Sequence, residues 1–358
     1  MRIIIFLSFI ILSACSQPKQ KTASPKIKTK KQNQKETVQV KITADKSKKT
    51  VIGDTINFKY NAKNGSADSI NLAINYKHYK VYYPDDSLTW NTSDANAGKN
   101  KLFFTFYWGD SITASKTFEF ELLSNIIPKK YTYKVIKKIP HNINAYTQGL
   151  EFSDGFLYEG TGLYKESMLY KIDFDKDEII QSINLPDEVF GEGITILNNR
   201  IYQLTWQSNT GFVYDKKTLN KLFEFDYPTE GWGLTNNDKE LIMSDGSENI
   251  YFLDTEFIQE THRIQVYDNK GAVKMLNELE YIDGLIYANV YGSDYIVAFE
   301  EKTGKVVKHI DLSGILKKKD IKSKIDVLNG IAWDKTNKRM VVTGKLWPYF
   351  YEIKLISK

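Results

Sequence analysis

Two patterns of apolar and polar residues divide this chain near residue 125. Before that point, apolar and polar residues alternate in short runs such as Val38–Ile42 and Ile56–Tyr60, and turn signals such as Asn64-Gly65 separate the runs. Alternation with a period of two is typical of strands that bury one face. We therefore predict an immunoglobulin-like β-sandwich over residues 38–125, and we find no catalytic constellation in it.

From Lys129 onward the strand pattern repeats. A short apolar strand, usually opening with glycine, is followed by a turn, a second apolar strand, a third strand and an Asp-containing turn. The units begin at Gly149, Gly193, Gly233, Glu278 and Gly330, so their starts are 44, 40, 45 and 52 residues apart. A period in the forties with four strands per unit is typical of a β-propeller. The predicted fold class is therefore all-β, with a five-bladed β-propeller over residues 129–358.

The last unit is one strand short at the C-terminus. We expect residues 131–137, at the start of the repeating region, to supply its outermost strand. Such pairing would close the ring of blades.

The register of the repeat indicates where a site would lie, because the innermost strands of a propeller line its central channel. The residues just before the inner strands are Gln148, Glu192, Trp232, Asn277 and Asn329. The residues at the ends of the second strands are Gly162, Trp206, Gly246, Tyr291 and Lys345. A purely structural repeat would keep similar residues at these positions, whereas these differ from blade to blade. The pattern is compatible with a binding site at one mouth of the channel and equally with a solvated polar mouth.

The first 37 residues concern location rather than fold. Met1-Arg2 precedes the apolar run Ile3–Leu12, which is shorter than the roughly 20 residues that a membrane-spanning helix needs. Leu12–Cys15 resembles the lipobox of bacterial lipoproteins, in which the cysteine is lipidated. We predict a signal peptide over residues 1–15 with Cys15 as lipid anchor. The alternative is an ordinary signal peptide with an incidental cysteine.

Residues 16–37 are rich in Lys, Gln and Ser and contain few apolar residues. Such a segment cannot bury enough surface to fold, so we predict a solvated tether. Together with the predicted anchor, it places the protein in the bacterial cell envelope, lipid-anchored on the periplasmic or extracellular face.

Composition narrows the possible chemistry. One cysteine and four histidines among 358 residues exclude an internal disulfide framework and a Cys-based zinc site, and they argue against a multi-histidine metal centre. A hydrophobic content of 42% excludes a disordered chain. The net charge of +5 is small for this length, so we expect no nucleic-acid partner.

Eight motifs follow one another through the repeating region and carry a family resemblance. They are Ala145–Leu150, Phe190–Thr195, Gln203–Trp206, Glu230–Thr235, Leu276–Tyr281, Ala288–Val290, Asp326–Trp333 and Val342–Pro348. In this order they resemble the glutamine cyclotransferase family, the glutaminyl-peptide cyclotransferases of plants and bacteria, over about residues 131–355. The resemblance implies a five-bladed propeller enzyme. Such an enzyme converts the N-terminal glutamine of peptides or proteins into pyroglutamate and releases ammonia.

The resemblance also implies roles for individual residues. Glu192 matches the proton shuttle of the family, and Lys345 and Asn277 would polarise the carboxamide and hold its oxygen. Tyr146 stands where many members have Phe, and Tyr291 stands where the family usually has Trp, which puts the shape of the pocket in doubt. The implied substrate-binding residues are Gln148, Tyr146, Phe190, Trp206, Trp232, Tyr291 and Asn329. No metal and no cofactor is expected.

Other interpretations of these residues stay open. The chain could be a non-catalytic lipoprotein propeller that binds peptide N-termini or glycans, or a hydrolase of the lactonase type, which usually needs a ring of carboxylate and Asn metal ligands. Glu192 could be a channel carboxylate, and Lys345 a solvated charge at a blade tip. We expect two tryptophans to pack within blades and three histidines to be structural or exposed. These residues are Trp333, Trp347, His141, His262 and His309.

Overall fold

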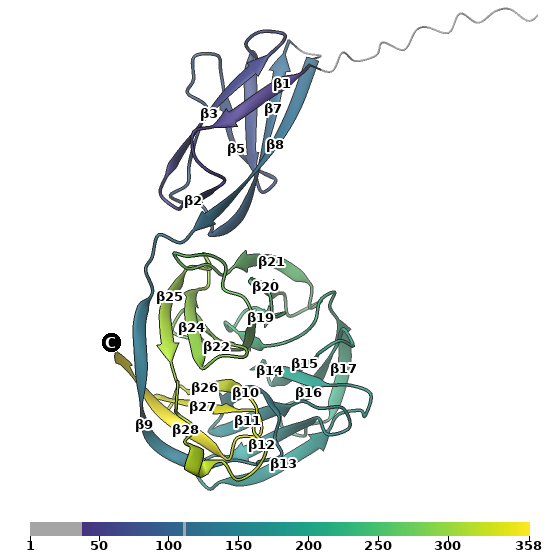
Figure 1. Ribbon diagram of the computed structural model, residues 1–358. Coiled ribbons are helices and arrows are strands. Elements are labelled where there is room, and N and C mark those ends of the chain that lie inside the picture. The colour runs from purple at the N-terminus through teal and green to yellow at the C-terminus, as the bar shows by residue number, and fades with distance from the viewer. Residues whose placement is uncertain (1–37, 110–111) are drawn as a thin grey trace, which may run out of the picture. The chain divides into compact units, whose positions relative to one another are not determined.

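The structure, a computed structural model, describes residues 38–109 and 112–358. The predicted signal peptide, Cys15 and the tether lie outside these residues. Nearly all regular structure in the described residues is β-strand, apart from the short 3₁₀ helix η1 (Lys318–Asp320) (Figure 1). No helix among them has the length and apolar character needed to cross a membrane.

The first strands form two sheets that share one core. One sheet has the order β1-β3-β6, and the other has the order β2-β8-β7-β4-β5. All pairings are antiparallel except that of β2 with β8. Trp90, Phe104 and Phe120 lie at the centre of the buried cluster. The immunoglobulin-like character of this region stays a prediction. The strands are β1 (Val40–Ala44), β2 (Lys49–Val51), β3 (Thr55–Ala62), β4 (Ser69–Ile74), β5 (Lys77–Tyr82), β6 (Thr89–Asn91), β7 (Gly98–Trp108) and β8 (Ile112–Leu123).

Within residues 112–358, the strands that follow form five blades, and the first three are separate four-stranded antiparallel sheets. In each, chain order runs from the innermost strand outward. The first blade contains β10 (Thr147–Ser153), β11 (Phe156–Thr161), β12 (Met168–Asp173) and β13 (Glu178–Asn184). The second contains β14 (Gly191–Leu197), β15 (Arg200–Thr205), β16 (Thr210–Asp215) and β17 (Lys221–Asp226). The third contains β18 (Leu234–Asn236), β19 (Leu241–Ser244), β20 (Asn249–Leu253) and β21 (Glu260–Gln265).

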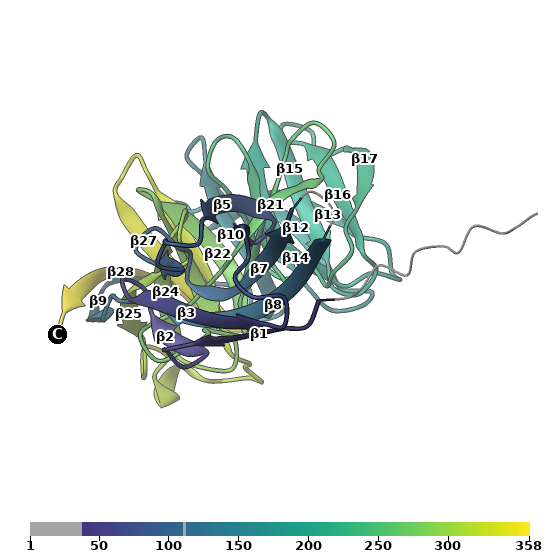
Figure 2. The same ribbon diagram turned by 90° about the horizontal axis from the view of Figure 1, so that it is seen from above.

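The fourth and fifth blades share an eight-stranded sheet through β9 (Lys129–Pro140). β9 pairs with β28 along Tyr131–Pro140 and also pairs in parallel with β25. Figure 2 shows β9 and β28 side by side. The predicted closure by residues 131–137 is therefore confirmed, and the closing strand is longer than expected. The remaining strands are β22 (Leu276–Ile282), β23 (Leu285–Val290), β24 (Tyr295–Glu300), β25 (Val306–Asp311), β26 (Leu328–Asp334), β27 (Arg339–Gly344) and β28 (Tyr349–Ser357).

The hydrophobic cores of the propeller lie between neighbouring blades. Leu169 of the first blade packs with Ile201 of the second in one cluster, and four further clusters join the other pairs around the ring. Each sheet is therefore covered on both faces. This explains why the second and third strands bury almost every residue, whereas the outer strands β13 and β17 are largely exposed.

Neighbouring inner strands approach so closely that glycine is required where they meet. A Cβ atom on Gly149 would collide with the backbone nitrogen of Ile194, and one on Gly233 would collide with the carbonyl oxygen of Asn277. The glycines that marked the repeat in the sequence therefore mark the contacts of the inner ring.

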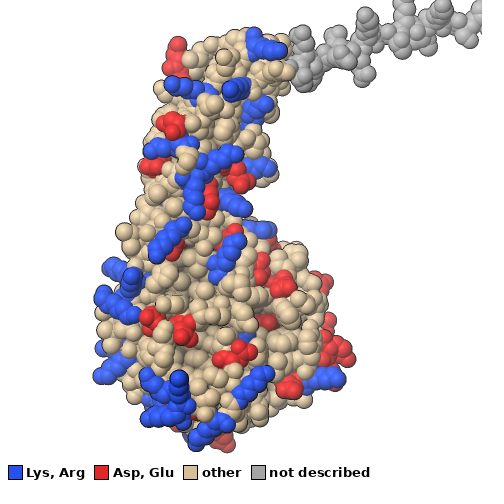
Figure 3. All heavy atoms as spheres, in the orientation of Figure 1, with Lys and Arg blue, Asp and Glu red and all other residues tan. Residues whose placement is uncertain are grey.

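On the outer surface, basic and acidic side chains both occur over the face drawn in Figure 3. The buried charged groups described below lie inside the propeller.

Candidate active site

The inner strands carry irregularities at the positions that the repeat register singled out. The ladder between the first two strands of a blade shifts register between Thr147 and Gly149, and equivalent shifts occur in the second, fourth and fifth blades. Such bulges leave a residue out of the ladder and turn its side chain. The residues in these bulges include Gln148, Glu192, Asn277 and Asn329, and Trp232 comes just before β18. All but Trp232 are buried.

Hydrogen bonds join three of these side chains. The Nε2 of Gln148 donates to Oε1 of Glu192 over 3.0 Å. The Nδ2 of Asn329 donates to Oε1 of Gln148 over 3.2 Å and to the carbonyl oxygen of Thr147 over 2.9 Å. The amide of Gln148 is therefore held at both ends, with its N–H group directed at Glu192.

Lys345 directly follows the second strand of the fifth blade, as the register predicted. Lys345 is only 3% exposed to solvent. Its Nζ atom lies 4.7 Å from the ring centre of Tyr146 and 5.0 Å from that of Tyr291. An ammonium group between two aromatic rings is stabilised by their electron-rich faces. The alternative of a solvated charge at a blade tip is inconsistent with this burial.

Aromatic rings form a wall beside the polar groups. Phe190 packs edge-on against Trp206, with ring centres 5.7 Å apart, and against Tyr146 at 6.0 Å. Trp232 packs in the same way on Tyr291 at 5.7 Å. All five are partly exposed, so the wall is accessible to a ligand.

The two glycines in the register make room for this wall. A Cβ atom on Gly162 would collide with the ring of Phe190, and one on Gly246 would collide with the ring of Trp232. The residue at the end of the second strand therefore differs between blades for a packing reason. In the blades with glycine at this position, an aromatic ring from elsewhere in the site fills the space.

Burial and neighbouring charges shift the pKa values of the two ionisable groups at the centre. Burial raises the pKa of the Glu192 carboxyl well above its ordinary value, Lys345 offsets part of this effect, and Glu230 adds to it. Burial lowers the pKa of the Lys345 ammonium, while Glu192 and Asp326 act in the opposite direction. Glu192 therefore keeps its proton to a higher pH than an exposed glutamate does.

A sequence model described as glutamine cyclotransferase matches residues 111–355 of the chain. The chain belongs to the glutamine cyclotransferase family. A glutaminyl-peptide cyclotransferase of Arabidopsis thaliana is 42% identical over 230 residues, which are 62% of this chain and 71% of that protein. The crystal structure of Myxococcus xanthus glutaminyl cyclase matches with a TM-score of 0.61 and 31% identity over 64% of this chain and 99% of that one. The resemblance inferred from the eight motifs is thereby confirmed, and so is the propeller fold.

The sequence analysis did not identify Glu230 and Asp326, two residues that form hydrogen bonds with the aromatic side chains of the site. Oε2 of Glu230 accepts hydrogen bonds from the indole N–H groups of Trp206, over 2.9 Å, and Trp232, over 3.0 Å. The hydroxyl group of Tyr146 donates to Oδ2 of Asp326 over 3.0 Å. Glu230 and Asp326 both lie inside quoted motifs, but only the fold shows which side chains they contact.

Asn277 is the predicted site residue that the structure connects least. Its side chain makes no hydrogen bond among the described residues, and its Oδ1 is buried without a partner.

The next residue, Glu278, has a different role. Its carboxylate accepts the backbone N–H of Leu150 over 3.1 Å and that of Ile331 over 2.8 Å, so it links inner strands of three blades.

The structure also places the two tryptophans and three histidines that the sequence analysis assigned to packing or structural positions. Trp347 is buried against Tyr351, and Trp333 packs against the same cluster. His262 is exposed and His309 half-buried, whereas His141 is buried. Across residues 38–109 and 112–358, no group of three or more His, Cys, Asp or Glu side chains is placed to hold a metal ion.

Proposed function

We propose that this chain is a glutaminyl-peptide cyclotransferase that acts on N-terminal glutamine and carries out an acyl transfer within that residue. The observation that carries the proposal is the buried Glu192 carboxyl group, which Gln148 contacts at 3.0 Å beside a buried lysine and an aromatic wall. The family and the names of the two relatives support the same reaction.

In the proposed reaction, the α-amine nitrogen of the substrate attacks the carbon of its own γ-carboxamide. A C–N bond forms, the bond to the amide nitrogen breaks, and ammonia leaves. The α-amine has a pKa of about 8, so part of it is neutral near pH 7. Glu192 accepts the proton that the attacking nitrogen loses and returns it to the leaving nitrogen. A carboxyl group with a raised pKa suits both steps.

The oxygen of the carboxamide gains negative charge during the attack. We assign its stabilisation to the ammonium group of Lys345, together with the side-chain amide of Asn277, which makes no hydrogen bond to the described residues. A cation in a buried site is effective here because little water screens it.

The aromatic wall would bind the aliphatic part of the glutamine and exclude water. Trp206 and Trp232 are fixed by Glu230, and Tyr146 is fixed by Asp326, so the wall needs little reorganisation when substrate binds. We assign substrate contacts to Gln148 and Asn329 as well. In this scheme, side chains supply the proton transfer and the positive charge, so we propose catalysis without a metal.

The decisive experiment follows ammonia release from a peptide with N-terminal glutamine by the full chain, with and without a chelator. We expect turnover that the chelator leaves unchanged, and a loss of about 10²–10⁴-fold for Glu192→Gln. A parent protein that binds the peptide without releasing ammonia would instead be a binding module. Full activity of Glu192→Gln would refute the role of Glu192, and loss of activity with the chelator would refute metal-independence.

We further propose that the enzyme is a lipoprotein of the bacterial cell envelope. The support is the sequence Leu12–Cys15 and the polar segment 16–37. A lipid-anchored enzyme of this kind would meet peptide N-termini outside the cytoplasm.

A further inference from the structure

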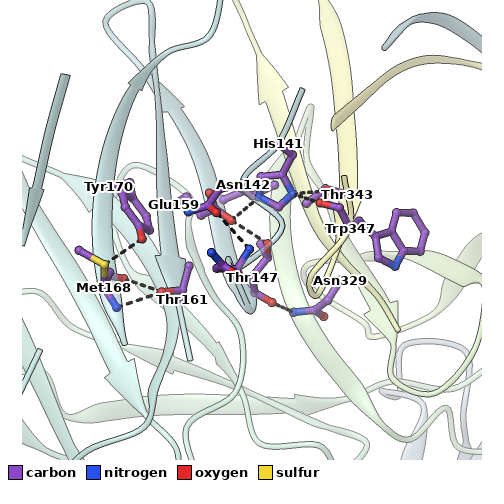
Figure 4. A network of polar contacts seen from close by, with 12 residues as sticks. His141, Asn142, Thr147, Glu159, Thr161, Met168, Tyr170, Asn329, Thr343 and Trp347 are labelled. Carbon is purple, nitrogen blue, oxygen red and sulfur yellow. Dashed lines mark hydrogen bonds and ion pairs between the residues drawn. The ribbon is translucent and has the colours of Figure 1, made fainter. Parts of the chain in front are cut away.

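His141 has no role in the proposed reaction, yet both nitrogens of its buried ring meet acceptors. It comes directly after β9. Nδ1 lies 2.8 Å from the carbonyl oxygen of Trp347, and Nε2 lies 3.0 Å from Oε1 of Glu159 (Figure 4). The side chains of His141 and Glu159 are only 1% and 2% exposed, so these contacts replace water almost completely.

The contacts satisfy both nitrogens of the imidazole ring. A carbonyl oxygen can only accept, so Nδ1 of His141 carries a hydrogen. Oε1 of Glu159 accepts the hydroxyl hydrogen of Thr147 over 2.7 Å and shares a further hydrogen with Nε2 of His141. Both ring nitrogens and this carboxyl oxygen are therefore hydrogen-bonded without water.

The pair joins two segments that carry the site. On one side it binds the carbonyl oxygen of Trp347, two residues after Lys345. On the other, through Glu159, it binds Thr147, whose neighbour Gln148 contacts Glu192. Figure 4 shows His141 between Glu159 on one side and the segment of Thr343 and Trp347 on the other.

The turn that carries Lys345 needs such support. Leu346 has a φ of 61°, a conformation that costs a residue with a side chain roughly 1–2 kcal/mol. Backbone bonds from Leu346 to Ala145 and from Trp347 to Gly344 hold the turn, and the imidazole fixes the carbonyl oxygen of Trp347. Because apolar groups can often replace both partners of a buried hydrogen bond without loss of stability, stability alone does not explain this pair.

We propose that His141 and Glu159 form a positioning pair that holds the Lys345 turn and the Gln148 strand in register for catalysis. The inference rests on the proposed function for its catalytic part. The pair touches neither substrate nor reacting atoms. It acts through Trp347 and Thr147 on the residues that do.

The test compares variants of the full chain. His141→Gln and Glu159→Ala break the pair, whereas Glu159→Gln keeps a hydrogen-bonding group at the same place. Arg339→Gln is the matched control, because Arg339 lies on β27 and pairs with Asp334 at 2.9 Å without contact to the site. For each variant we would measure the melting temperature, kcat and KM well below melting, and hydrogen exchange of segments 145–149 and 343–348.

We expect kcat/KM to fall about 10–100-fold in His141→Gln and Glu159→Ala, and to stay within about threefold of the parent in Glu159→Gln and Arg339→Gln. Exchange should accelerate in both segments only in the first two variants. Unchanged kcat/KM with unchanged exchange would overturn the proposal and leave a structural pair. If the parent shows no cyclotransferase activity, the proposed function fails, and the exchange data alone decide whether the pair holds the two segments.

Discussion

The Glu192 carboxyl group lies among charges that act on its pKa in opposite directions. Lys345 lowers this pKa and Glu230 raises it, against a background of burial that raises it strongly. If Glu192 must be ionised to accept a proton from the substrate amine, kcat/KM falls as the pH drops through its pKa. Substituting Lys345 or Glu230 therefore tests whether each charge shifts the pKa of Glu192 as expected.

Lys345→Met removes the positive charge, so the pKa of Glu192 rises and the acidic limb of the kcat/KM profile moves to higher pH. The rate on the plateau should also fall about 10²–10³-fold, because the charge that stabilises the oxyanion is gone. A pH series of initial rates measures both effects. An unshifted limb with an unchanged plateau would contradict the role of Lys345.

Glu230→Gln should move the same limb in the opposite direction. Removing this negative charge lowers the pKa of Glu192, so activity persists to lower pH. The glutamine oxygen can still accept an indole N–H group, so we expect the aromatic wall to stay in place and KM to change little. A limb that moves to higher pH, or does not move, would disprove this assignment.

At the scale of elements, the inner strands both build the ring and present the site. Gly233 touches the carbonyl oxygen of Asn277 in the next blade, so the residue that permits close approach of the strands also neighbours a proposed catalytic amide. The bulges give these strands a second function, because they release one side chain per strand from the ladder.

Gly233→Ala tests this coupling. The added methyl group meets backbone atoms that cannot move aside easily, so we expect a loss of about 1–3 kcal/mol in the free energy of unfolding, together with reduced kcat. Gly271→Ala is the control, since its Cβ would meet only the end of the Lys49 side chain. Chemical denaturation and initial rates provide the measurements. Equal stability of the two variants would contradict the close packing of the inner strands.

At the scale of the whole molecule, the ring is closed by pairing β9 with the C-terminal strand β28. This pairing joins the start and end of the repeating region. His141 immediately follows β9, so the closing strand also places the histidine of the proposed positioning pair, whereas Glu159 lies on β11.

The proposed anchor is tested on the whole protein. Cys15→Ser should shift the enzyme from the membrane fraction to the soluble fraction of its host and abolish labelling by a fatty-acid probe. Specific activity should be unchanged, because Cys15 lies outside the propeller. A Cys15→Ser protein that stays in the membrane fraction would show that something else anchors it.

The sequence by itself determined the all-β class, the number of blades, the closing strand and the family. Each depends on local period, on glycines such as Gly149 and Gly193, or on motifs that are contiguous in the chain. It also placed Glu192 and Lys345 in the two sets of register positions that face one mouth of the channel, because a repeat relates spacing along the chain to position around an axis.

Only the tertiary structure decided which side chains meet. The contacts of Glu230 with the two tryptophans and of His141 with Glu159 join segments whose separation in sequence carries no periodic signal. Burial is likewise a property of the assembled ring. The raised pKa of Glu192 comes from its burial in the ring and from the neighbouring charge of Glu230. The chemistry of the site therefore depends on desolvation and charge proximity, which arise when the blades pack together.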